Sequence, residues 1–524
     1  MRIDARAALA LLIFATVGPA TAAMPLTPLE EHGRRLYRDG VAVSGAPITA
    51  RMAGATNALA GMPVACGNCH GEDGRGRAES GVDPGDVTWT ELTKPYGHAH
   101  ANGRRHGPFD AMSLARAVND GIDPGGNAFS PAMPRYSAST ADLEALVAYL
   151  ERIDRTFDRG LSDTTIRIGT LLPSSGRMAD AGSAVRRVLA AYFDAVNGRG
   201  GVHGRKLLLV VEARGDDPDA ARAAARRLVA AEDVFALLAP VSAQIERDLA
   251  EAADAAQVPV VGPLTLYPED TKASSANVFH LLSGVPELAD VLGMHAHPTL
   301  ALSGRPVALL HAAGSDGSAT AAAVEAHLRE RGYANLYRVP LGPETTPAAI
   351  ADAIAAKKAA GILVLAPTPV LTDVAKVLAR GGTPPQWLIP APLLPRDVLD
   401  WPAAYQGRIT VAYPVLAGDR TAQARAELDA LLQDDGAPRP YLALQAQAYS
   451  AAVVLVEGLS RSGRELSRKK LVAALEGLSN FEPGLVPRVT YNADRRIGAL
   501  GGYPVAVDLA ARDFRPVGGF LRLQ

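Results

Sequence analysis

The last two thirds of the chain alternate short apolar runs with alanine-rich segments whose apolar residues recur at helical spacing. In one such segment, apolar side chains recur from Ala184 to Val196, and Asn197-Gly198 then supplies a helix stop signal. This alternation predicts parallel sheets covered by helices on both faces, and the length of the region favours two lobes. The strand-like runs are Ile166–Leu172, Lys206–Val211, Phe235–Leu238, Val258–Val261, Val307–His311, Ile362–Leu365, Trp387–Ile389 and Ile409–Val411.

The first third of the chain is rich in Gly, Pro and His and has few strand-like runs. It predicts a short helix near its start and a second helix over Ser139–Ile153, where Ser139 and Asp142 form a variant of the capping box. The 524 residues exceed what one core usually organises, so we place a domain boundary in 154–165. The predicted helix faces are Leu29, Gly33, Leu36 and Tyr37 in the first helix and Leu143, Leu146, Leu150 and Ile153 in the second.

The chain contains two cysteines, and both lie in the run Cys66-Gly67-Asn68-Cys69-His70. This C-x-x-C-H spacing attaches a c-type haem: two thiols add to the vinyl groups of the porphyrin, and the following histidine ligates the iron. A C-x-x-C pair can also be a redox dithiol or half of a zinc site. Zinc would require a second ligand pair, and a redox dithiol would require a βαβ context; neither is found in the sequence. We therefore predict one covalent haem c on Cys66 and Cys69, with His70 as an axial ligand.

The N-terminus is typical of an export signal. Arg2 and Arg6 precede an apolar run from Ala7 to Val17, and small residues end at Ala23, so we expect a signal peptide over residues 1–23, cleaved near Ala23. No later stretch is expected to span a membrane. The formal net charge of -2 becomes -3 in the mature chain, which gives no reason to expect nucleic acid or an anionic membrane as a partner. The predicted location is the periplasm.

Residues 27–155 resemble a class I cytochrome c, a small all-α domain. The likeness rests on the C-x-x-C-H motif, on Gly71, Gly74 and Gly76 after it, and on an N-terminal helix that crosses a C-terminal one at a glycine, with Tyr149 as the packing aromatic. The resemblance implies that Met133, in Ser130-Pro131-Ala132-Met133-Pro134, is the second axial ligand, and His/Met ligation is typical of electron carriers. The alternatives are Met62, Met112 and the histidines at 98, 100 and 106, which we otherwise expect in a solvated loop.

Residues 164–524 resemble the periplasmic solute-binding proteins of the leucine/isoleucine/valine-binding type. The most specific likeness is Asn197-Gly198-Arg199-Gly200-Gly201-Val202-His203-Gly204-Arg205, supported in order by Ile168-Gly169 to Gly176, Asp216-Asp217-Pro218, Val258-Pro259-Val260-Val261 and Ala448-Tyr449-Ser450-Ala451-Ala452. The resemblance implies two Rossmann-like lobes of a type I periplasmic-binding fold. It also implies three crossovers, placed near residues 285, 410 and 485, and a ligand held between the lobes at the carboxyl ends of strands.

The same resemblance suggests ligand residues. In one lobe they are Ser242, in the loop Pro240-Val241-Ser242-Ala243, with Thr265 after the next strand and Ser174 beside them. Ser242 has the alternative role of capping the following helix. In the other lobe, Ala181 and Asp316 replace aromatic residues of the family, and Pro390-Ala391-Pro392 stands near the family's acidic position. A branched-chain amino acid is therefore not the expected ligand.

Three functions follow from this combination of domains. We favour a non-enzymatic electron-transfer protein whose lobes bind a small organic solute or a redox partner, and which serves a periplasmic dehydrogenase, such as a quinoprotein. The second is the solute receptor of an ABC importer with its permease as partner, carrying an accessory haem domain. The third is a haem-linked oxidoreductase acting on a molecule held between the lobes. No catalytic constellation is found in the sequence.

Overall fold

The structure is a computed structural model that describes residues 26–52, 54–71, 73–76, 84–100, 103–153, 158–230, 233–268, 275–381, 384–432, 440–464 and 466–523. The expected signal peptide, with Ala23, and the first residues of the expected domain boundary, 154–157, lie outside the described residues. The chain divides into two units, Met1–Phe157 and Asp158–Gln524.

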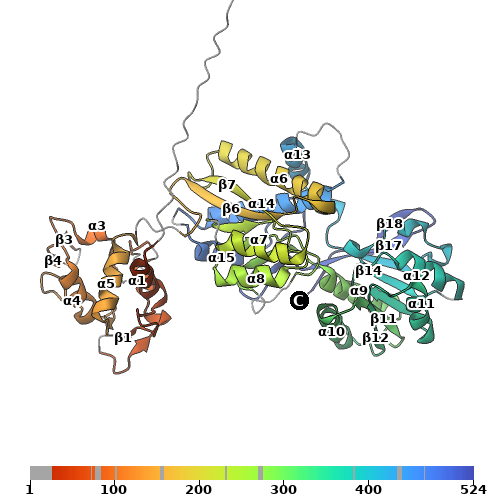
Figure 1. Cartoon of the computed structure of the whole chain (residues 1–524), viewed down its shortest axis with the longest axis horizontal. Helices are drawn as coiled ribbons and strands as arrows, with labels where there is room; N and C mark the ends of the chain where they lie inside the picture. Colours follow the sequence, from red (N-terminus) through yellow and green to blue (C-terminus); the bar gives the residue numbers. More distant parts are fainter. Residues whose placement is uncertain are drawn as a thin grey trace, which may run out of the picture. The chain divides into compact units, whose positions relative to one another are not determined.

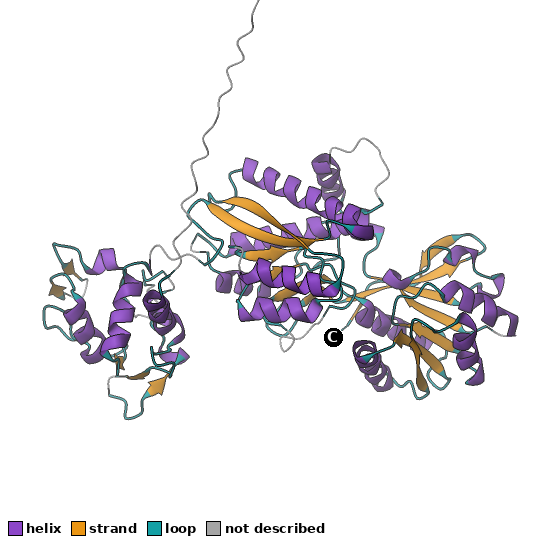
Figure 2. Ribbon diagram, in the orientation of Figure 1, coloured by secondary structure: helices purple, strands orange, loops and turns teal. Residues whose placement is uncertain are grey.

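The N-terminal unit is mainly helical, as Figures 1 and 2 show. It is not wholly α-helical as expected, because it also contains a small three-stranded sheet of order β2-β1-β5 and a two-stranded hairpin of β3 and β4. Its helices are α1 (Pro28–Asp39), α2 (Gly67–His70), α3 (Trp89–Leu92), α4 (Ala111–Asp120) and α5 (Thr140–Leu150). Its strands are β1 (Thr49–Arg51), β2 (Leu59–Ala60), β3 (His98–Ala99), β4 (Arg105–His106) and β5 (Arg135–Tyr136).

The crossing of α1 and α5 organises the core of this unit. Gly33 lies so close to α5 that a Cβ atom built on it would stand 1.9 Å from the carbonyl oxygen of Ala145. The rings of Tyr37 and Tyr149 meet beside it, with centroids 5.6 Å apart. Helix α5 begins at a capping box in which the Ser139 side chain accepts from Asp142 N–H, as predicted from the sequence.

Two expectations for this unit were wrong. Leu29 is 46% exposed and does not share the buried face of α1. The histidines at 98, 100 and 106 do not lie in a solvated loop, because His98 and His106 pair across the β3–β4 hairpin and His106 is buried. A pairing between strands depends on the register of the hairpin, which the local sequence pattern does not reveal.

The C-terminal unit contains two mainly parallel sheets with helices on both faces, as predicted (Figure 2). The first sheet has the order β16-β10-β9-β8-β6-β7, and all of its pairings are parallel. Its strands are β6 (Thr165–Leu172), β7 (Lys206–Ala213), β8 (Ala236–Leu238), β9 (Val260–Val261), β10 (Val278–Leu282) and β16 (Ile497–Ala499).

The second sheet has the order β12-β11-β13-β14-β15-β17-β18, with β19 beside β17. The strands from β12 to β15 are parallel, and β17 and β18 add to that edge antiparallel. Its strands are β11 (Val307–Ala312), β12 (Leu336–Leu341), β13 (Gly361–Val364), β14 (Gln386–Pro390), β15 (Ile409–Tyr413), β17 (Gly501–Asp508), β18 (Asp513–Pro516) and β19 (Leu521–Arg522).

One of the three passages between the two sheets lies where it was expected, and the other two lie further along the chain. The first passage, between β10 and α9, is near residue 285 as predicted. The second was expected near 410, but β15 extends to Tyr413 within the second sheet. The third was expected near 485, but β16 still pairs with β10 in the first sheet, so the passage falls at Leu500, just before β17.

Helices cover both sheets, and one of them corrects an expectation. Helix α14 has 20 residues and is long and apolar enough to cross a membrane, although no such segment was predicted. It is mostly buried and packs against α6 and α15, which is the environment of a core helix. The helices are α6 (Ala179–Gly198), α7 (Pro218–Ala230), α8 (Glu246–Ala255), α9 (Val285–Thr299), α10 (Ser315–Glu330), α11 (Pro347–Ala356), α12 (Leu371–Leu378), α13 (Ala422–Leu432), α14 (Leu442–Arg461) and α15 (Arg468–Glu476).

We predict that Gly33→Ala destabilises the N-terminal unit by about 1–3 kcal/mol, because the new methyl group collides with the backbone of α5. Gly107→Ala is the matched control, since a Cβ atom at Gly107 meets nothing within 4 Å. Denaturant unfolding of the two variants, followed by circular dichroism, measures the difference. Equal stability of the two variants would show that the helices move apart without cost.

Candidate functional site

One helical turn carries the three residues of the predicted haem attachment. Cys66 stands at the N-cap of α2, and Cys69 and His70 lie within the helix. Both thiols are free, Cys69 is exposed, and His70 is buried. The short helix therefore presents two unbonded thiols and one imidazole from the same turn.

The imidazole of His70 is fixed by the backbone. Its Nδ1 lies 3.0 Å from the carbonyl oxygen of Gly85, so Nδ1 carries the proton and Nε2 keeps its lone pair for a metal. Burial lowers the pKa of His70, which favours the neutral, ligating form. Gly71, Gly74 and Gly76 all have positive φ, and a Cβ at Gly76 would stand 2.4 Å from the Gly85 carbonyl oxygen. The expected glycine turn thus brings this carbonyl group to the histidine.

Two tyrosines support the same turn. The hydroxyl group of Tyr37 donates to the carbonyl oxygen of Gly71 at 2.7 Å, and that of Tyr136 donates to Val64 at 2.6 Å. The Sγ atom of Cys66 lies 4.0 Å from the Tyr136 hydroxyl oxygen. Tyr136 belongs to β5, just after the segment with Met133, so it connects that segment to the haem-attachment turn.

Met133 is half-buried in the segment before β5. The guanidinium of Arg135 donates to the carbonyl oxygens of Met133 at 2.5 Å and Phe129 at 3.4 Å. It lies over Gly121, where a Cβ atom would collide with it. Among the alternative ligands, Met62 and Met112 are 56% and 80% exposed, which makes them poor candidates. The donor set of two thiols, an anchored imidazole and a thioether fits haem c.

The predicted solute residues of the first lobe lie at the carboxyl edge of its sheet. The strand order places β6 between β7 and β8, so the connections after β6 and β8 leave in opposite directions. Ligands of doubly wound sheets bind at such a switch point. Ser174 follows β6 and is exposed, whereas Ser242 follows β8 and is buried. Thr265 follows β9, next to the bridge between Val241 and Leu264.

The loop with Ser242 is held by the backbone and by a buried arginine. The N–H groups of Val241 and Ser242 donate to the carbonyl oxygens of Leu171 and Leu264. The buried guanidinium of Arg214 donates to the carbonyl oxygens of Val241 and Ala243. Helix α8 begins at Glu246 with Ile245 as its N-cap, so Ser242 does not cap it and the alternative role for this serine is wrong.

Glu246 lies at the same edge of the sheet, although no sequence pattern marks it. The hydroxyl group of Thr265 donates to Glu246 Oε1 at 2.6 Å, so the one proton of Thr265 is committed to this carboxyl group. Burial raises the pKa of Glu246, which favours its uncharged form. The only sequence signal was an acidic residue four positions after Ser242, which by itself is typical of a solvated first helical turn.

A cavity of about 20 Å³ opens beside these residues, lined by Ser242, Glu246, Tyr267 and His280 among others. Burial lowers the pKa of His280 to about 3, so its imidazole is neutral, and its Nδ1 atom has no hydrogen-bond partner. The Tyr267 hydroxyl group donates to the carbonyl oxygen of Leu365 at 3.1 Å, just after β13. Because β11 and β13 flank the switch point of the second sheet, this bond ties the first lobe to the corresponding edge of the second.

The predicted residues of the second lobe are only partly in the places expected. Asp316 is exposed at the start of α10, directly after β11, where Ser315 Oγ lies 3.4 Å from its carboxylate. Ala181 was assigned to this lobe, but it is buried in α6 of the first lobe. Pro390 and Ala391 follow at the carboxyl end of β14 and bring no acidic side chain.

Comparison with known families agrees with this division of the chain. The periplasmic binding protein family matches residues 165–508, and the cytochrome c family matches residues 55–154. No curated protein matches the chain by sequence.

Solved structures resemble the C-terminal unit in fold. A fatty acid ABC transporter substrate-binding protein from Thermomonospora curvata is 18% identical, with a TM-score of 0.55, covering 70% of this chain and 95% of its own. A leucine binding protein from Thermotoga maritima MSB8 is 17% identical, with a TM-score of 0.54, covering 68% of this chain and 99% of its own. The chain therefore belongs to the periplasmic binding protein family and carries a cytochrome c domain in front of its binding-protein fold.

Proposed function

We propose that this chain is a periplasmic electron carrier with one covalent haem c, joined to a module that binds a small organic solute. The observation that carries the proposal is the Cys66-x-x-Cys69-His70 turn, with its anchored imidazole, in the same chain as a periplasmic-binding fold. The N-terminal signal peptide directs export to the periplasm and is cleaved near Ala23.

Four residues are proposed to hold the haem. Cys66 and Cys69 would form the thioether links, and His70 and Met133 would ligate the iron. When bound, haem c supplies an iron that alternates between the ferrous and ferric states and so carries one electron. The Gly85 carbonyl group orients the His70 ring, and Arg135 restrains the segment that carries Met133.

The electrons are exchanged with a partner protein, which we propose to be a periplasmic dehydrogenase of the quinoprotein class. In this role the binding module recognises either the solute of the dehydrogenase or the dehydrogenase itself. We favour this non-enzymatic role over oxidation of a solute by the chain itself, since no constellation of catalytic residues was recognised in the sequence.

A second candidate function is that of a solute receptor for an ABC importer. It is favoured by the similar structures, among them a fatty acid ABC transporter substrate-binding protein and a putative branched-chain amino acid ABC transporter. Solute uptake by cells with and without the gene distinguishes the two roles. A receptor is required for uptake, whereas an electron carrier is required for solute-dependent respiration.

The solute is proposed to be a small uncharged organic molecule rather than a carboxylate or an α-amino acid. The Thr265 proton and the N–H groups of Val241 and Ser242 are already engaged, which leaves few donors for a carboxylate. The raised pKa of Glu246 weakens it as a partner for an ammonium group, and an unpaired buried cation is costly. Ser242 is the proposed donor to the solute, with Ser174 and Asp316 as further contacts.

We predict that the purified mature protein retains haem after denaturing electrophoresis and that Cys66→Ala or Cys69→Ala abolishes normal attachment, because each removes one thioether. Haem staining of the gel measures this. The control is Ser460→Ala, an exposed residue of α14. A mature wild-type protein without a stained band would refute the haem assignment.

We predict that Met133→Ala removes the sulfur-to-iron absorption band of the oxidised protein and lowers the reduction potential, since a thioether ligand favours ferrous iron. Absorption spectroscopy and redox titration measure the two effects. Met112→Ala, at an 80% exposed methionine, should leave both unchanged. Persistence of the band in Met133→Ala would assign the ligand to another residue.

We predict that small alcohols or aldehydes raise the melting temperature of the C-terminal unit, whereas leucine, isoleucine and valine do not. A ligand that binds only the native state stabilises it, so a thermal-shift screen detects binding, and calorimetry quantifies it. Ser242→Ala should weaken binding of the hit about tenfold without changing the haem spectrum, because it removes one hydrogen bond of about 1.4 kcal/mol. Tight binding of leucine would contradict the proposed solute class.

A further inference from the structure

Three histidines gather on one face of the β3–β4 hairpin in the N-terminal unit. His98 lies directly opposite His106 in the register, and the pairing continues as His100 N–H donates to the carbonyl oxygen of Arg104 at 2.9 Å. Residues two apart on one strand and opposite on its partner share a face. The ring centroids are accordingly 4.8 to 6.0 Å apart. The register of the hairpin therefore brings three imidazoles together.

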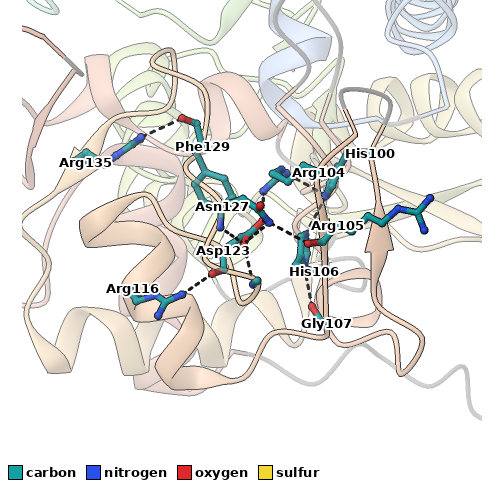
Figure 3. Close-up of polar contacts among 11 residues, drawn as sticks. His100, Arg104, Arg105, His106, Gly107, Arg116, Asp123, Asn127, Phe129 and Arg135 are labelled. Atoms are coloured by element: carbon teal, nitrogen blue, oxygen red, sulfur yellow. Dashed lines mark hydrogen bonds and ion pairs between the residues drawn. The ribbon is translucent and has the colours of Figure 1, made fainter.

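The protons of these imidazoles cannot satisfy all of their contacts. His106 Nδ1 lies 2.7 Å from the carbonyl oxygen of Gly107, so the proton is on Nδ1 and Nε2 has a lone pair. His100 Nε2 lies 3.0 Å from His106 Nε2 and 3.1 Å from a nitrogen atom of the Arg104 guanidinium group (Figure 3). The guanidinium group can only donate hydrogen bonds. If His100 carries its proton on Nε2, that N–H group faces the N–H group of Arg104. If Nε2 is unprotonated, its lone pair faces the lone pair of His106 Nε2. Either tautomer leaves one unfavourable contact.

His98 adds a third nitrogen atom that lacks a partner. Its Nε2 atom is buried and has no hydrogen bond, and its side chain is only 12% exposed. Its Nδ1 atom lies 3.7 Å from Glu91 Oε1, and the carboxylate favours a proton on that side of the ring. The lone pair of His98 is then also on Nε2. A carboxylate or carbonyl group behind a histidine is the usual arrangement for a histidine that ligates a metal.

We propose that His98, His100 and His106 bind one divalent transition-metal ion, of the zinc, copper or nickel class, through their Nε2 atoms. Imidazole nitrogen suits these ions, and three histidines leave a fourth position for water. The metal replaces the unfavourable lone-pair contact between His100 and His106 by two coordinate bonds, and it supplies the partner that His98 lacks. The proposal is independent of the haem and of the solute.

Binding requires a local rearrangement. The rings are stacked, with interplanar angles of 18° to 30°, and no three side chains of the described residues are set in ligating geometry. The rings must turn about their Cβ–Cγ bonds until the three lone pairs converge. The Nε2 atoms of His100 and His106 are already at a separation suited to two ligands of one ion.

The charges around the hairpin allow this change. Arg104 must withdraw from His100, but it retains its ion pair with the buried carboxylate of Asp123 at 3.1 Å. Asp123 is held by Asn127, whose side chain also donates to the carbonyl oxygen of Arg105 at 3.0 Å (Figure 3). Glu91 and Asp123 together place two carboxylates beside the cluster, and Arg104 balances the charge of Asp123. Lys94 pairs with Glu91 on its other side.

The test uses the full-length haem protein and Zn²⁺ as the probe. After equilibrium dialysis against Zn²⁺, elemental analysis should give one zinc per chain, and X-ray absorption at the zinc edge should show three imidazole ligands. His100→Ala and His106→Ala should each lose the bound zinc. His32→Ala, at a half-buried histidine of α1, is the matched control and should retain it.

Two further variants separate a metal site from a merely structural cluster. Glu91→Gln should weaken zinc binding about 10- to 100-fold, as expected for the loss of a carboxylate behind a ligating histidine. Arg104→Gln should strengthen binding, because it removes the cation that competes for His100. Wild-type protein without stoichiometric zinc, or zinc retained after both histidine substitutions, would overturn the proposal. A haem absorption spectrum unchanged in every variant shows that the N-terminal unit is still folded.

Discussion

The parallel pairing of strands is the constraint on which the binding module depends. A parallel strand cannot follow its neighbour through a tight turn, so each pair requires a crossover that returns the chain to the same end of the sheet. The carboxyl ends of β6, β8 and β9 therefore meet at one edge, and Ser174, Ser242 and Thr265 follow those ends. These residues are far apart in sequence and come together only because every strand runs in the same direction.

The buried guanidinium group of Arg214 keeps the Ser242 loop at this edge in place. Arg214 bonds to the carbonyl groups of the Ser242 loop, where a lost partner would leave buried carbonyl oxygens unpaired. Ala239 and Gln244, which flank the loop, both have positive φ, a conformation costly for side chains other than glycine. The loop is thus held in a strained form by contacts from a different connection, which is common where a protein binds a ligand.

The sequence predicted the parts of the molecule that local patterns determine. The haem motif, the capping box at Ser139 and most parallel strands follow from spacing over a few residues. The strands β17 and β18 were not predicted, because they join the second sheet from the end of the chain, far from their partner β15. The Thr265–Glu246 bond was missed for the same reason: it joins a strand end to a helix start, and only the fold sets that distance.

In the N-terminal unit, the segment between α4 and α5 contacts both the β3–β4 hairpin and the arginine that holds Met133. Asn127 bonds to the hairpin through the Arg105 carbonyl group, and two residues later the Phe129 carbonyl group accepts from Arg135, which also holds Met133. A short segment fixed at both ends has few conformations to lose when a ligand binds to it. The position of Met133 therefore depends on the contacts that Arg135 makes with this segment as well as on the local sequence.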